Sequence, residues 1–165
     1  MKKALTILAI LPLLLIISGC PVGIAYPLGY NGKEKIDKQL IGSWIQSNTE
    51  MEVMKMEIEK LNDNTLKLTI KERGAMFMEE SDVFRGWCTT IDNQDFVYFQ
   101  EKDSLGANYY HYAYKFDGKK LITYDMSLLE GGIDAVTSTE AFRAEVIASI
   151  KKPEFLSAET IWEKD

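Results

Sequence analysis

Few residues in this 165-residue chain could act as nucleophiles, acid–base groups or metal ligands. The chain has two cysteines, Cys20 and Cys88, and one histidine, His111. A hydrolytic triad places its histidine beside a nucleophile and a carboxylate, and no nucleophile motif accompanies His111, which we expect to be exposed or hydrogen-bonded. Zinc and calcium sites need clustered ligands at set spacings, which this sequence does not offer. We therefore expect no catalytic residues, no metal, no cofactor and no enzymatic activity.

Cys20 is distinguished by the segment that precedes it. Lys2 and Lys3 are followed by an almost wholly apolar run over residues 4–17. This run is shorter than the roughly 20 residues that a membrane-spanning helix needs. A basic start, a short apolar core and then small residues are typical of a secretory signal peptide. The pattern predicts that the protein is exported.

The stretch Ile17-Ser18-Gly19-Cys20 resembles the lipobox of bacterial lipoprotein precursors. The resemblance implies that residues 1–19 are a lipoprotein signal peptide, cut off just before Cys20. It also implies that the Cys20 sulfur carries diacylglycerol and that the new amine is often acylated. Two or more acyl chains anchor a protein stably to a bilayer. The expected location is the bacterial cell envelope, and the following Pro21 favours the outer membrane if the cell has two membranes. The alternatives are an ordinary signal peptide with a coincidental cysteine, or a short membrane anchor.

The composition of the mature chain limits its partners. Residues 20–165 hold 17 basic and 25 acidic side chains, a formal charge of −8, which argues against nucleic acid as a partner. The 146 residues suffice for one domain. With Cys20 lipidated, Cys88 has no partner for an intramolecular disulfide. Cys88 stands beside Trp87 in a strand-like run and is expected to be buried.

The pattern of the mature chain predicts a tether followed by one β-rich domain. After Pro21, residues 20–35 contain three glycines and one further proline, and they show no helical or strand period. We therefore interpret them as a lipidated tether. The domain spans residues 36–165. Alternation and turn signals predict strands over residues 44–47, 51–61, 65–72, 82–91, 95–101, 107–116, 121–126 and 159–163. A cap at Thr137 or Ser138 and an apolar stripe of Phe142, Val146, Ile147 and Ile150 predict a helix over residues 139–150.

Seven or eight short strands and one late helix predict a mostly β fold, either an antiparallel barrel or a strongly curved sheet. Gly42-Ser43-Trp44, just before the first strand, resembles the Gly-x-Trp signature that opens lipocalin-type barrels. The resemblance implies a lipocalin-like barrel. The sequence departs from the family by lacking an Arg on its last strand to stack on Trp44. The alternative is a flatter sheet with the helix packed on one face.

A ligand pocket is the remaining candidate site, because a barrel of about eight strands can enclose one small ligand. In this interpretation Arg85 is a buried cationic anchor for an acidic ligand, and aromatic side chains form the walls. The candidate ligand-binding residues are Trp44, Arg85, Trp87, Tyr98, Tyr110, Tyr112 and Tyr114. The alternative is that these aromatic side chains simply fill the core.

Two functions remain open. The first is a non-enzymatic, membrane-anchored binding module for a small apolar ligand or a partner protein. The second is an inhibitor or immunity-type lipoprotein that acts through exposed loops, such as residues 75–81 or 128–134.

Overall fold

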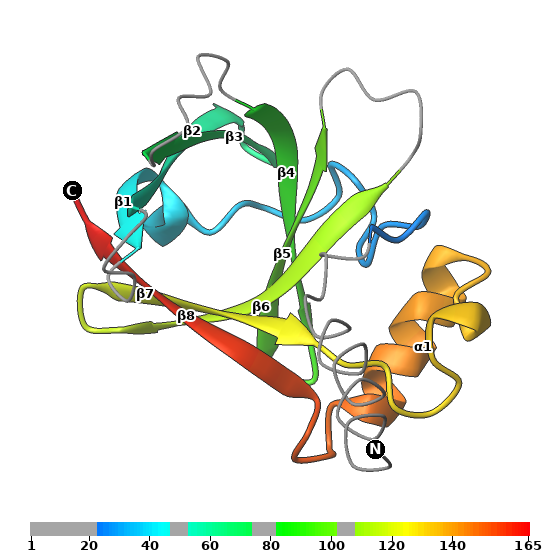
Figure 1. Ribbon diagram of the computed structural model, residues 1–165. Helices are drawn as coiled ribbons and strands as arrows, with labels where there is room; N and C mark the ends of the chain where they lie inside the picture. Colours follow the sequence, from blue (N-terminus) through cyan, green and yellow to red (C-terminus); the bar gives the residue numbers. More distant parts are fainter. Residues whose placement is uncertain (1–22, 47–52, 74–81, 102–107) are drawn as a thin grey trace, which may run out of the picture.

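The computed structural model describes residues 23–46, 53–73, 82–101 and 108–165 (Figure 1). Eight antiparallel strands form a closed barrel in which each strand pairs with its neighbours in sequence, and β1 also pairs with β8. The predicted mostly β barrel with one late helix is confirmed. The flatter sheet is excluded, because β1–β8 pairing leaves no free edge. The strands are β1 (Gly42–Gln46), β2 (Val53–Asn62), β3 (Thr65–Arg73), β4 (Asp82–Ile91), β5 (Gln94–Glu101), β6 (Tyr109–Asp117), β7 (Lys120–Met126) and β8 (Leu156–Lys164).

Strand alternation decides which side chains enter the barrel. Successive side chains point to opposite faces of a sheet, so Met54, Met56 and Ile58 of β2 face inward. The tight turns carry the residues that such turns need. Asp92 and Asn93, between β4 and β5, both have positive φ, and so does Gly118 between β6 and β7, as expected for two-residue hairpins.

A short 3-10 helix, η2 (Lys38–Leu40), precedes β1 and closes one end of the barrel. The Asp37 side chain caps it by accepting a hydrogen bond from the Gln39 amide at 2.9 Å. The Leu40 side chain is fully buried, and the Leu40 carbonyl accepts a hydrogen bond from the Trp44 indole at 2.8 Å. These contacts join η2 to β1. We call this end of the barrel the floor and the opposite end the mouth.

The connection from β7 to β8 carries η3 (Ile133–Ala135) and then α1 (Thr139–Ser149), which lies against the outside of the barrel (Figure 1). Ser138, one of the two predicted caps, accepts a hydrogen bond from the Ala141 amide at 3.1 Å. Phe142 and Val146 are fully buried, whereas Ile147, predicted to share their stripe, is 47% exposed. The helix therefore covers the barrel wall with a narrower face than predicted.

The wall divides the buried residues into two groups. The interior cluster lies inside the barrel and comprises Ile36, Leu40, Trp44, Met56, Ile58, Leu66, Leu68, Cys88, Val97, Phe99, Tyr114, Leu121 and Trp162. The outer cluster lies between the wall, α1 and the amino-terminal segment. It comprises Leu28, Trp87, Ile91, Phe96, Tyr98, Tyr109, Ala113, Val136, Phe142, Val146 and Phe155.

The last strand is longer than predicted. It begins at Leu156 rather than near Glu159, and Ala158 within it adopts a positive φ of 47°. The pairing of β7 with β8 shifts register there, between Thr123 and Asp125. Such a bulge interrupts the alternation of side chains, and that alternation was the signal used to predict the strand.

The expected tether over residues 20–35 is wrong from residue 23 onward. The Ile24 amide donates to the Tyr109 carbonyl at 3.0 Å, and the Tyr109 amide donates to the Ile24 carbonyl at 2.8 Å. Leu28 is fully buried, and its carbonyl accepts a hydrogen bond from Arg143 of α1 at 3.1 Å. A single buried leucine and a single bridge create no periodic pattern, so composition alone indicated a flexible segment.

Several predictions fall outside the described residues: the signal peptide, the lipidation of Cys20, and the loop over residues 75–81. In the described part of the chain, no helix has the length and apolar character required to cross a bilayer.

Candidate binding cavity

The barrel wall separates the predicted ligand-binding residues. Trp44 and Tyr114 belong to the interior cluster, and Tyr112 packs against it. Tyr110 lies on the same face of β6 and contacts Phe84 edge to face, with ring centroids 6.1 Å apart. These four residues thus share the barrel interior.

The other three predicted residues lie on the outside. Trp87 pairs with Tyr98 across β4 and β5, and their rings stack at 5.8 Å in the outer cluster. Arg85 is exposed, so its predicted role as a buried anchor is wrong. The physical reason is the alternation of side chains between the two faces of β4. Phe84 and Cys88 mark the inward face of β4, and the odd-numbered residues of β4 point away from it.

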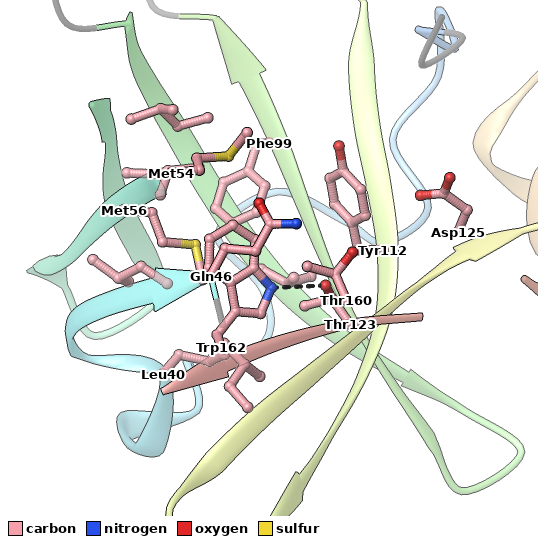
Figure 2. A pocket seen from close by; sticks show the side chains of 15 residues that line it. Leu40, Gln46, Met54, Met56, Phe99, Tyr112, Thr123, Asp125, Thr160 and Trp162 are labelled. Atoms are coloured by element: carbon pink, nitrogen blue, oxygen red, sulfur yellow. Dashed lines mark hydrogen bonds between the residues drawn. The ribbon is translucent and has the colours of Figure 1, made fainter. Parts of the chain in front are cut away.

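The interior contains a cavity of about 230 Å³ (Figure 2). Most of its walls are apolar, and its polar groups come mainly from β1, β6, β7 and β8. The lining residues are Leu40, Gln46, Met54, Met56, Ile58, Leu68, Ile70, Val97, Phe99, Tyr112, Leu121, Thr123, Asp125, Thr160 and Trp162. Tyr112 is thus the one residue of the predicted set that lines this cavity.

Two local features shape the cavity walls. Gly86 pairs with Phe99, and a Cβ atom at residue 86 would come within 2.6 Å of the Phe99 ring. A glycine there allows the ring to lie flat against the wall. The Trp162 indole donates a hydrogen bond to the Thr123 hydroxyl at 3.0 Å (Figure 2). This bond fixes a large aromatic wall and satisfies its polar atom, which leaves that wall apolar toward the cavity.

Polar side chains gather where the cavity approaches the mouth. Gln46 ends β1, and Asp125 is the last residue but one of β7. Both strands run from the floor to the mouth, since β1 begins beside η2 and neighbouring strands are antiparallel. Burial raises the pKa of Asp125. The pKa of the Tyr112 phenol is also raised, first by burial and then by the negative charge of Asp125.

A second, more polar pocket of about 190 Å³ lies outside this cavity. It includes Glu34, Asp37, Asp95, Cys88 and Tyr114, and the Tyr114 hydroxyl donates to Asp37 at 3.3 Å. Cys88 is buried, as predicted, and burial raises its thiol pKa to about 11. Such a thiol is a poor nucleophile near neutral pH. Among the described residues, no group of three or more His, Cys, Asp and Glu side chains is arranged to hold a metal ion.

His111 occupies a site that the sequence did not predict. It lies on the outer face of β6, with its ring 4.8 Å from Phe142 of α1 and 5.7 Å from Tyr98. Both ring nitrogens are buried, and neither has a hydrogen-bond partner within the described part of the chain. Burial lowers the pKa of His111 to about 3, although backbone groups of Tyr109 and Tyr26 act in the opposite direction. The expectation that His111 is exposed is therefore wrong.

Trp44 has a cationic neighbour on the last strand after all. The Lys164 ammonium lies 5.2 Å from the centre of the Trp44 ring, within the range of a cation–π contact. The sequence showed no Arg on this strand, and a Lys at its end supplies the charge instead. A search that allowed any cation on the last strand would have found it.

Some lining residues could have been predicted. The alternation of Met54, Met56 and Ile58 already placed them on one face of a strand, and that face lines the cavity. Asp125 and Thr160 carried no such signal, because they flank the bulge between β7 and β8.

Comparisons with protein-family models, with curated proteins and with solved structures found no match for this chain.

Proposed function

We propose that this protein is a lipid-anchored binding module of the bacterial cell envelope, and that its barrel holds a small apolar ligand. The cavity of about 230 Å³ inside the barrel is the observation that supports the ligand. Small ligands bind in concave, mostly apolar sites with a few placed polar groups. The Met-rich wall and the polar groups near the mouth have that character.

The anchor is supported by the sequence alone, through the lipobox-like Ile17-Ser18-Gly19-Cys20. In the proposal Cys20 carries the lipid, and in a two-membrane cell the protein resides in the outer membrane. The barrel acts by binding and not by catalysis. The lipocalin-like character of the barrel is also part of the proposal, and the packing of Lys164 on Trp44 supports it.

Native mass spectrometry of protein purified from its own host tests the ligand. We expect a fraction of the molecules to carry an additional small, apolar compound. Protein that is empty after gentle purification, and that also takes up no apolar probe, would contradict the proposal.

A blocked cavity provides the matched test. Met54 lines the cavity on β2, so Met54→Trp should fill its upper part and abolish uptake of an apolar fluorescent probe. Leu61→Trp is the control, because Leu61 is 55% exposed near the turn after β2. Equal probe uptake by the two variants would place the binding elsewhere.

A Cys20→Ala variant tests the anchor. We expect this variant to leave the membrane fraction and to lack the mass of the lipid. A variant that stays in the membrane with unchanged mass would refute the lipobox interpretation.

The alternative is an inhibitor or immunity-type lipoprotein, and one observation favours it. The loop over residues 128–134 is held rigidly, because the Glu145 carboxylate accepts hydrogen bonds from the amides of Glu130, Gly131 and Gly132. This loop leads into η3, where Ile133 is 47% exposed. Ile133→Asp should abolish capture of a partner protein and leave probe uptake unchanged if this alternative is correct.

A further inference from the structure

The described residues that line the cavity carry a negative charge and no positive charge. Among these described residues, Asp125 is the only formally charged one, and none of them is Lys, Arg or His. Binding sites for carboxylate or phosphate groups use Arg, Lys or backbone amides to hold the anion. This cavity presents a carboxylate instead.

Asp125 also lacks a protein partner. No hydrogen bond or ion pair joins its carboxylate to any other residue within the described part of the chain, and burial alone raises its pKa. The Asp125 side chain is exposed near the mouth, and the partial burial that raises its pKa disfavours its charged form only modestly. A ligand cation would relieve this cost.

The Tyr112 side chain indicates where such a cation would lie. Its phenol is close enough to Asp125 for the carboxylate charge to raise its pKa, and both side chains line the cavity (Figure 2). A protonated amine has three donors for such acceptors. Aromatic faces such as those of Tyr112 and Trp162 also attract cations.

The volume limits the size of the ligand. An apolar cavity of about 150 Å³ holds benzene, so the observed 230 Å³ suits a compound with on the order of ten non-hydrogen atoms. Long-chain lipids exceed this volume.

We infer that the ligand is a small amphipathic cation, with an aromatic or short aliphatic body in the cavity and a protonated amine at Asp125 and Tyr112. The inference rests on the proposed function, since it names the class of ligand for the same cavity. It reverses the expectation of an acidic ligand held by Arg85, which lies on the outer face of β4, away from the cavity. The formal charge of −8 on the mature chain also favours the approach of cations.

Three probes with one body and different head groups test the inference: 4-phenylbutylamine, 4-phenylbutanol and 4-phenylbutanoate. Binding is measured by titration calorimetry or NMR on the full mature chain carrying Cys20→Ala, which needs no detergent. We expect the amine to bind about threefold more tightly than the alcohol, because a cation paired with a solvent-exposed carboxylate gains only a modest free energy. The carboxylate should bind most weakly.

Asp125→Asn identifies the residue responsible. We expect the variant to bind the amine no better than the alcohol, and to bind the alcohol as the native chain does. Asp117→Asn is the matched control, since Asp117 is an exposed acid at the end of β6 and should leave all three affinities unchanged. Affinity for the amine should also fall as acid neutralises Asp125, whereas affinity for the alcohol should not.

The outcomes separate the two proposals. If the alcohol binds and the amine shows no preference, or if Asp125→Asn keeps the preference, the inference fails and the proposed function stands. Tightest binding of the carboxylate also overturns the inference. If none of the probes binds and native protein is empty, both proposals fail.

Discussion

The two apolar clusters on either side of the barrel wall differ in their share of aromatic side chains, which is larger in the outer cluster. The outer cluster joins its elements through close ring contacts, such as Trp87 on Tyr98 at 5.8 Å and His111 on Phe142 at 4.8 Å. The interior cluster also contains rings, such as Trp44 and Phe99, but it adds Met56 and more branched aliphatic side chains and retains a cavity. Methionine adapts its shape readily, whereas rings have defined packing geometries. The comparison teaches that the outside of this barrel holds α1 in place and the inside leaves room for a ligand.

The clusters also differ in whether their buried polar atoms are hydrogen-bonded. Inside, the Trp162 indole is satisfied by Thr123 at 3.0 Å. In and around the outer cluster, the Tyr98 hydroxyl and both nitrogens of His111 are buried without a hydrogen bond to any described residue. An unsatisfied buried group costs stability. The outer cluster should therefore be the more sensitive of the two to acid and to substitution.

The largest effect should come from removing a ring of the outer cluster. Phe142 is fully buried, and Phe142→Ala should reduce the free energy of unfolding by about 3–5 kcal/mol. Met56→Ala, beside the existing cavity, should cost about 2 kcal/mol, since its side chain makes fewer contacts. Urea unfolding of both variants measures this difference. Equal costs would mean that the interior is packed as tightly as the outer cluster.

Loss of the Glu145 charge should have the next largest effect. Burial by itself would raise the pKa of Glu145, but the amides of Gly131, Glu130 and Gly132 and the Ser149 hydroxyl hold it below its usual value. Glu145→Gln should cost about 2 kcal/mol, because hydrogen bonds to a charged group are lost. Chemical denaturation at pH 7 measures the cost. The exposed Glu154→Gln on the same connection is the control, and a similar loss there would refute a specific role for Glu145.

Lowering the pH should then reveal how His111 affects the stability of the fold. Its pKa is about 3 in the folded protein against about 6.5 in an unfolded chain. The unfolded state therefore binds more protons between these values, and stability falls as the pH drops below about 6.5. The pKa of Glu145 is also lowered, but for an acid group this favours the charged form. Its contribution to stability is therefore lost only below about pH 4.5.

His111→Phe should remove the loss of stability that His111 causes below about pH 6.5. At pH 5 the variant should be more stable than the native chain by about 1–2 kcal/mol, with a smaller difference at pH 8. Urea midpoints at the two pH values measure it. An unchanged pH dependence in the variant would show that His111 is already accessible to protons in the folded protein.

The smallest effect should arise at the floor. Lys164→Met removes the charge over Trp44 but retains most of the side-chain length, and should cost about 0.5–1 kcal/mol. Lys164→Arg should restore or exceed native stability, because Arg also stacks on aromatic rings. Thermal unfolding of both variants measures the effect. Equal destabilisation by Met and Arg would show that the ring and the charge do not interact.

Local patterning was enough to predict the strands, because most of them alternate regularly. The strand over residues 82–91 matches β4 at both ends, and the cap at Ser138 is also confirmed. Errors arose where alternation is interrupted or absent. The bulge at Ala158 concealed the start of β8, and the isolated contacts of Ile24 and Leu28 gave no periodic signal.

The candidate site was harder to predict than the fold. To know which face of a strand lines the cavity, one must know how the strands close into the barrel. Trp87 and Tyr112 are both aromatic strand residues, yet one lies outside the barrel and the other lines the cavity. Since α1 covers part of the outer wall, both faces of β4, β5 and β6 are apolar there. Hydrophobicity then cannot tell inside from outside, and only the pairing of the strands decides.

If Cys20 carries lipid, as proposed, the bridge between Ile24 and Tyr109 limits how far the domain can stand from the bilayer. Tyr109 opens β6, which begins at the mouth, so the first described residues are held at that end of the barrel. Three peptide steps separate Cys20 from Gly23, a span of roughly 10 Å when fully extended. With lipid on Cys20, the mouth would be kept within about that distance of the bilayer surface. A ligand dissolved in the membrane could then enter the barrel directly, without a journey through bulk water.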